Sequence, residues 1–189
     1  PSRIPIIAIT GTNGKTTTTR LTSHILRNSG FKVGMTTTDG IYIMNRMLVK
    51  GDCTGPVSAQ FVLKDPLVDM AVLECARGGI IRAGLGFEHC DVGIVTNVAA
   101  DHLGLQDINT IEELAAVKSV VPRAVRRDGW VILNADDELV MGMRKQADAK
   151  LALFSMDENN RLIKAHMKGG GLAAIYEYGF KKKRKGLLL

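Results

Sequence analysis

Short, continuously apolar runs alternate along the chain with longer segments in which apolar residues recur at helical spacing. Strands covered on both faces of a sheet have unbroken apolar sequences, so each run predicts a buried strand. The runs occupy residues 4–9, 33–36, 70–73, 92–95, 131–133 and 151–154. Residues 16–28 and 111–126 predict helices, and a glycine break at 169–171 precedes one more short strand. This alternation predicts an α/β fold with a doubly wound, mainly parallel sheet.

Polar residues follow the predicted strands at the points where the strands end. Ligands of open α/β sheets bind beyond the carboxyl ends of the strands, so these residues are the first candidates for a site. The strand exits carry residues 10–16 (TGTNGKT), Glu74, Thr96-Asn97 with Asp101-His102 after them, and residues 134–137 (NADD). The sequence therefore predicts one polar site built from four strand exits.

Residues 11–16 have the composition and the position of a phosphate-binding loop. Glycines allow backbone N–H groups to turn toward phosphates, Lys15 can neutralise the β and γ oxygens, and Thr16 can ligate Mg²⁺. With this loop, the expected fold is a sheet of the P-loop type. The motif departs from the commonest phosphate-loop pattern, because Ile9 stands at the position of its first glycine. The alternative is an ordinary turn before a threonine-rich helix. The predicted nucleotide-binding residues are Gly11, Thr12, Asn13, Gly14, Lys15, Thr16 and Thr17.

The sequence TGTNGKT resembles the loop that opens the central domain of the Mur ligase family, and further segments extend the resemblance to about Tyr178. These segments are TTDG at 37–40, GDCTGP at 51–56, LECARGG at 73–79, TNVAADHLG at 96–104 and NADD at 134–137. Taken in order, they are most similar to the family members that attach arginine to aspartate side chains of a poly-aspartate backbone. Peptidoglycan-type and folylpolyglutamate-type ligases remain alternatives, although Gly104 stands where the peptidoglycan enzymes usually carry aspartate.

The resemblance implies ATP and Mg²⁺ as cofactors, with Thr16, Glu74 and His102 as the metal-binding residues. Glu74 ends a predicted buried strand and can reach a metal without leaving the sheet edge. A capping or ion-paired carboxylate is the structural alternative for Glu74, and a purely structural histidine is the alternative for His102. Asp101 is expected to orient the loop beside His102.

Lys118 falls on the apolar stripe of its predicted helix, where a charge is unfavourable. One interpretation is an aliphatic stem that packs on the protein while the ammonium reaches water. The other is a side chain that points toward the site, where the resemblance implies a carbamylated lysine supporting a second metal. Lys15, His102 and Lys118 form the predicted catalytic set.

Asn134 and Asp137 are assigned to the nucleotide, because the matching asparagine of the family contacts adenine. An Asn-Asp turn or a helix N-cap explains the same residues, together with Asp136, without any ligand. Residues 52–56 and 77–79 have the glycines of loops that approach a substrate closely.

Composition changes this picture little. Residues 181–185 supply five of the basic side chains behind the net charge of +6. The rest of the chain is therefore nearly neutral, and nucleic-acid binding is not expected. Three separated cysteines indicate neither disulfides nor zinc and favour a cytoplasmic location. The apolar stretch at residues 4–9 is far shorter than a membrane span, so no membrane association is expected.

These observations predict an ATP-binding domain over residues 1–179 and a basic tail over 180–189. The resemblance implies an ATP-dependent ligase that activates a carboxylate substrate as an acyl phosphate for attack by an amino-acid amine. Such enzymes need flanking domains of the same chain, so we expect a fragment with little activity of its own. Assembly into a homo-oligomer is left open by the sequence. A P-loop NTPase switch and a nucleotide-binding module without catalysis are the competing classes.

Overall fold

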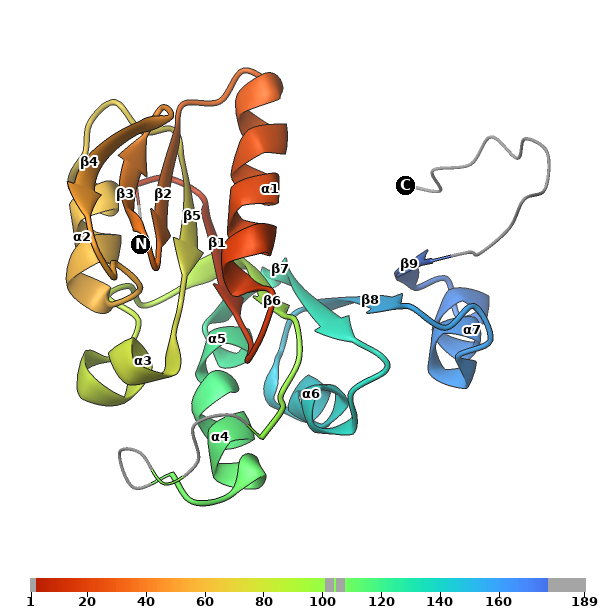
Figure 1. The fold of residues 1–189 in the computed structure, drawn as a ribbon. Coiled ribbons are helices and arrows are strands. Elements are labelled where there is room, and N and C mark those ends of the chain that lie inside the picture. The colour runs from red at the N-terminus through yellow and green to blue at the C-terminus, as the bar shows by residue number, and fades with distance from the viewer. Residues whose placement is uncertain (1–2, 101–103, 105–107, 177–189) are drawn as a thin grey trace.

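The computed structural model describes residues 3–100, 104 and 108–176. One nine-stranded sheet runs in the order β4-β3-β2-β5-β1-β6-β7-β8-β9 (Figure 1). The strands are β1 (Ile6–Thr10), β2 (Val33–Thr37), β3 (Gly40–Ile43), β4 (Arg46–Lys50), β5 (Met70–Glu74), β6 (Cys90–Val95), β7 (Val125–Asn134), β8 (Lys150–Ser155) and β9 (Leu172–Ile175). All neighbouring strands are parallel except the antiparallel pairs β2·β3 and β3·β4.

The helices follow the strands as the predicted alternation requires. They are α1 (Lys15–Asn28), α2 (Pro56–Lys64), α3 (Arg77–Ala83), α4 (Ile111–Lys118), α5 (Val120–Arg123), α6 (Glu138–Gly142), the 3₁₀ turn η1 (Met143–Gln146) and α7 (Arg161–Lys168). The mainly parallel α/β fold is thereby confirmed. No helix in the described part of the chain is both long enough and apolar enough to span a bilayer.

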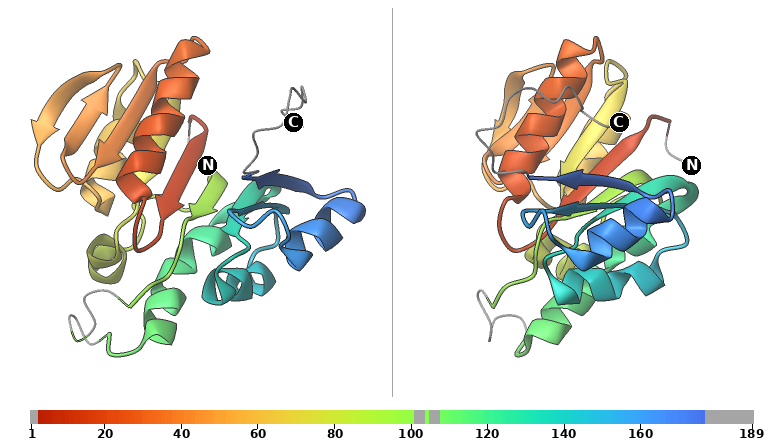
Figure 2. Two further views of the ribbon diagram at one scale, coloured as in Figure 1. Left: turned by 45° about the vertical axis from the view of Figure 1, so that its right-hand side comes forward. Right: turned by 90° about the vertical axis from the view of Figure 1, so that its right-hand side faces the viewer.

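Helices cover both faces of the sheet, as Figures 1 and 2 show for α1 on one side and α2 and α5 on the other. Alternate residues of β1 supply the two faces. Ile9 joins Val33 and Val72 beneath α1, whereas Ile6 and Ala8 belong to the larger apolar cluster on the other face. Burial on both faces explains why β1 reads as a continuous apolar run.

The structure differs from the sequence prediction of local structure at two places, one missed hairpin and one wrong helix. The hairpin β3–β4 escaped prediction because β4 is an edge strand with every residue exposed, so its sequence carries no burial pattern. The single helix expected over residues 111–126 is divided into α4 and α5, and β7 begins at Val125. Pro122 cannot donate a backbone hydrogen bond, and Val125 pairs with Cys90 of β6, so the sheet takes over where the helix was expected to continue.

Burial in the core predicts which leucine-to-alanine substitutions destabilise the folded chain. Leu133 of β7 is completely buried, whereas Leu67 is 53% exposed. We expect Leu133→Ala to lower the free energy of unfolding by about 2–5 kcal/mol, because the deletion leaves a cavity among packed neighbours. Leu67→Ala is the matched control and should cost less than about 0.5 kcal/mol. Urea unfolding of both variants measures the difference, and equal losses would contradict the burial.

Candidate functional site

The carboxyl ends of β1, β5, β6 and β7 meet at one edge of the sheet, and the predicted phosphate loop lies there between β1 and α1 (Figure 1). Two of its residues require glycine. Gly11 has φ +146° and Gly14 has φ +82°, both in the region that side chains disfavour. A Cβ on Gly11 would also overlap the hydroxyl of Thr96. The glycines of the motif are therefore dictated by backbone geometry.

The end of β6 holds this loop in place. Thr12 N donates to Asn97 O over 2.9 Å, and Asn13 N donates to Asn97 Oδ1 over 2.8 Å. The Asn97 amide and the Thr96 hydroxyl in turn donate to Asn13 O, over 3.1 and 2.6 Å. The sequence predicts Thr96 and Asn97 only as polar residues at a strand exit, and their support of the loop becomes visible in the structure.

Two lysine ammonium groups contact carbonyl oxygens of the loop. Lys15 Nζ donates to Thr12 O over 2.7 Å, and Lys118 Nζ donates to Gly11 O over 2.9 Å. Lys118 is only 3% exposed, so the interpretation that its ammonium reaches water is wrong. Both cations instead lie at the loop, where they favour the binding of an anion. Carbamylation of Lys118 stays a prediction.

Glu74 and Thr16 lie side by side at the ends of β5 and the loop. Thr16 Oγ1 donates to Glu74 Oε2 over 2.9 Å and lies 3.3 Å from Thr38 Oγ1. Glu74 is 2% exposed, and its Oε1 is buried with no hydrogen-bond partner among the described residues. Burial raises the pKa of Glu74, while the Thr16 hydroxyl and the Lys15 charge oppose that rise.

A buried carboxylate oxygen without a donor, beside a hydroxyl, is a suitable pair of ligands for a hard cation such as Mg²⁺. The predicted pair Thr16 and Glu74 therefore fits a metal. The third predicted ligand, His102, lies outside the described residues, as does Asp101, so their roles stay predictions. Thr38 lies in the 37–40 segment that resembles the family, but the sequence assigns it no role. It carries no local sign that Thr38 approaches Thr16.

Asn134 and Asp137 connect the end of β7 to its surroundings. Asn134 Nδ2 donates to Thr96 O over 2.9 Å, and Asn134 Oδ1 accepts from Asp136 N over 2.9 Å. Asp137 caps α6 by accepting from Val140 N over 3.0 Å and also accepts from Val98 N over 2.6 Å. The turn and the N-cap offered as structural alternatives are thus both present, and nucleotide contacts of these two residues stay predictions. Thr17 is exposed in the first turn of α1.

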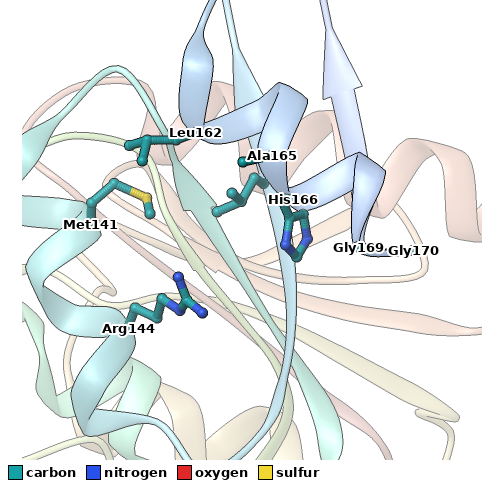
Figure 3. A pocket seen from close by; sticks show the side chains of 9 residues that line it. Met141, Arg144, Leu162, Ala165, His166, Gly169 and Gly170 are labelled. Carbon is teal, nitrogen blue, oxygen red and sulfur yellow. The ribbon is translucent and has the colours of Figure 1, made fainter.

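The substrate-side loops expected at residues 52–56 and 77–79 lie together and line two cavities of about 270 and 350 Å³. The second cavity includes Ala76 and Arg77, just beyond the end of β5. A third cavity of about 470 Å³ lies elsewhere, between α6 and α7, where Met141, Arg144 and His166 face one another (Figure 3).

Fold and site together define an α/β domain with a phosphate-binding loop at the carboxyl edge of its sheet. The family model of the Mur ligase middle domain matches residues 9–182, so this chain belongs to the Mur ligase family.

Curated relatives and solved structures agree with this assignment. Cyanophycin synthetase of Crocosphaera subtropica is 61% identical over 180 residues, which are 95% of this chain and 21% of that protein. UDP-N-acetylmuramoylalanine–D-glutamate ligase of Symbiobacterium thermophilum is 31% identical over 81% of this chain and 29% of its own length. A solved UDP-N-acetylmuramoyl-L-alanyl-D-glutamate–2,6-diaminopimelate ligase covers 82% of this chain and 33% of its own, with a TM-score of 0.70 and 25% identity. The chain spans about a fifth of the length of its cyanophycin synthetase relatives.

Burial of Glu74 is expected to make the stability of the folded chain depend on pH. Because burial raises its pKa, ionised Glu74 destabilises the folded chain relative to the unfolded one. That cost is absent below the ordinary glutamate pKa of about 4.3 and grows as the pH rises from there through the raised pKa of the folded state. We expect Glu74→Gln, without nucleotide or metal, to unfold at higher urea concentration than the parent chain at pH 8 and to lose this advantage near pH 4.5.

Urea unfolding at several pH values measures this difference. Glu112→Gln, on the exposed first turn of α4, is the matched control for the loss of one carboxylate. The same pH-dependent gain in both variants would contradict the assignment of the effect to burial of Glu74.

Proposed function

We propose that this chain is the ATP-binding central domain of an ATP-dependent amide ligase of the cyanophycin synthetase kind. The observation that carries the proposal is the phosphate loop held against the end of β6, with the Thr16–Glu74 pair at its helix end. The 61% identity to a cyanophycin synthetase over 95% of the chain supports the choice within the family.

In the proposed site, the backbone of the loop from Gly11 to Gly14, with Lys15, Thr16 and Thr17, binds the phosphates of ATP. Asn134 and Asp137 lie on the adenine side. Mg²⁺, held by Thr16 and Glu74 and by His102 as the resemblance implies, would neutralise the phosphate oxygens. Lys118 contributes through Gly11, whose carbonyl it holds.

The proposed reaction needs no nucleophilic side chain. A carboxylate oxygen of the acceptor attacks the γ-phosphorus of ATP, and ADP leaves. The amine nitrogen then attacks the acyl carbon and loses a proton, the bond from that carbon to the phosphate oxygen breaks, and phosphate leaves as the amide forms. The tasks of Lys15 and its neighbours are positioning and charge neutralisation.

We further propose that the carboxylate is an aspartate side chain of a poly-aspartate backbone and that the amine is that of arginine. Flanking domains of the full-length protein would complete the amine site, since the chain corresponds to about a fifth of such relatives. The three cysteines are free and buried, in agreement with a reducing compartment such as the cytoplasm.

Lys15→Ala tests the phosphate loop. We expect a loss of about 10- to 100-fold in ATP affinity, because a charged donor to the phosphates is removed. Isothermal titration with MgATP measures the loss, with Lys145→Ala on the exposed surface of η1 as the control. Unchanged affinity in Lys15→Ala would count against the phosphate-loop assignment.

Phosphate release from ATP by the full-length protein tests the reaction. We expect release to require both arginine and a poly-aspartate primer, because the acyl phosphate forms on one substrate and is consumed by the other. Release with neither substrate would favour an NTPase switch. ATP binding without release would direct the search to other acid and amine pairs of the family.

A further inference from the structure

Two cavities beside the candidate site share one wall. The smaller, of about 270 Å³, and the larger, of about 350 Å³, are both lined by Asp52, Thr54, Gly79 and Arg82. Residues 52–55 connect β4 to α2, whereas Gly79 and Arg82 belong to α3. The shared wall therefore joins two segments that each follow a strand of the sheet.

The backbones of these two segments are in direct contact. A Cβ on Gly79 would lie 2.9 Å from Gly55 Cα and 2.9 Å from Thr54 O, closer than a side chain tolerates. Glycine at position 79 therefore lets α3 approach the 52–55 segment closely. Such close packing sets the separation of the two backbones that carry the polar side chains.

The shared wall carries two opposite charges that are not paired with each other. Asp52 Oδ1 accepts from Thr54 Oγ1 over 2.7 Å and from Thr54 N over 3.2 Å, which orients the carboxylate. Among the described residues, Arg82 forms no ion pair or hydrogen bond, and its guanidinium lies beside Gly78. One carboxylate and one guanidinium are thus both available to a ligand.

This wall adjoins the phosphate end of the site. The larger cavity is lined by Ala76 and Arg77, just after Glu74, and the residue after Asp52 is held at the end of β2, where Cys53 N donates to Thr37 O over 3.0 Å. A molecule bound in the cavities would therefore lie next to the Thr16–Glu74 pair, where the proposed reaction needs a carboxylate.

We propose that Asp52 and Arg82 determine which acceptor the ligase accepts, by pairing with charges of the acceptor that do not react. Arg82 binds a carboxylate of the terminal aspartate other than the one that is phosphorylated, and Asp52 binds a guanidinium already attached to the preceding unit. The inference rests on the proposed function, and it makes the acceptor a peptide of both charge signs.

The test uses the full-length protein, MgATP, arginine and three short primers. The first is an aspartate peptide whose side chains carry arginine and whose last aspartate is free. In the second, citrulline replaces arginine and so removes only the cationic charge. In the third, the terminal α-carboxylate is an amide. Phosphate release gives the KM and kcat for each primer.

We expect the parent enzyme to prefer the first primer to either analogue by about two- to fivefold in kcat/KM, the range of an exposed ion pair, because Asp52 and Arg82 are both exposed. Asp52→Asn should lose the preference for arginine over citrulline and keep the preference for the free carboxylate. Arg82→Gln should show the reverse. Because each variant should lose a different preference, the result distinguishes charge recognition from a general disturbance of α3.

Asp148→Asn and Arg161→Gln are matched controls on exposed positions and should keep both preferences. Unaltered preferences in Asp52→Asn and Arg82→Gln would overturn the inference. A raised KM for MgATP with an unchanged primer KM would also overturn it, because the two charges would then act at the nucleotide. Absence of phosphate release with any primer in the parent enzyme would instead contradict the proposed function.

Discussion

The candidate site depends on the contact between the glycine loop after β1 and the Thr96–Asn97 segment after β6. In a parallel sheet, neighbouring strands end at the same edge, so the exit of one strand can hold the exit of the next. Here the Asn97 side chain and backbone satisfy polar groups of Thr12 and Asn13, and Gly11 leaves room for Thr96. The loop is thereby shaped without any ligand, and two of its N–H groups, those of Thr12 and Asn13, are already engaged by Asn97.

The same edge buries charges of opposite sign, an arrangement that costs free energy unless the charges have partners. Lys118 donates to the carbonyl oxygen of Gly11, whereas Glu74 Oε1 accepts no hydrogen bond from the described residues. A structural ion pair would have satisfied both groups, and the described residues form none between them. Incomplete satisfaction at a strand exit, beside the predicted phosphate loop, is the feature that the proposed cation site would account for.

The sequence predicted the parts of this molecule whose signals are local. Apolar runs located six of the nine strands in the described part of the chain, because burial on both faces leaves an unbroken pattern. The glycine break located β9, and the GTNGKT motif located the loop. The hairpin β3–β4 has no such pattern, and the division between α4 and α5 depends on pairing of Val125 with Cys90, 35 positions earlier. The support of the loop by Thr96 and Asn97, and the approach of Thr38 to Thr16, likewise join residues that only the fold brings together.

The proposed phosphate loop and the proposed acceptor wall occupy different parts of the sheet edge. The loop after β1, which we propose binds the phosphates of ATP, has a backbone geometry that leaves little freedom for substitution at Gly11 and Gly14. The 52–55 segment and α3 meet at glycines but present Asp52 and Arg82 outward, where side chains can change without disturbing the sheet. A family can therefore keep one way of activating a carboxylate and vary the acceptor by changing charges on the neighbouring wall, since function is determined by the site and not by the fold.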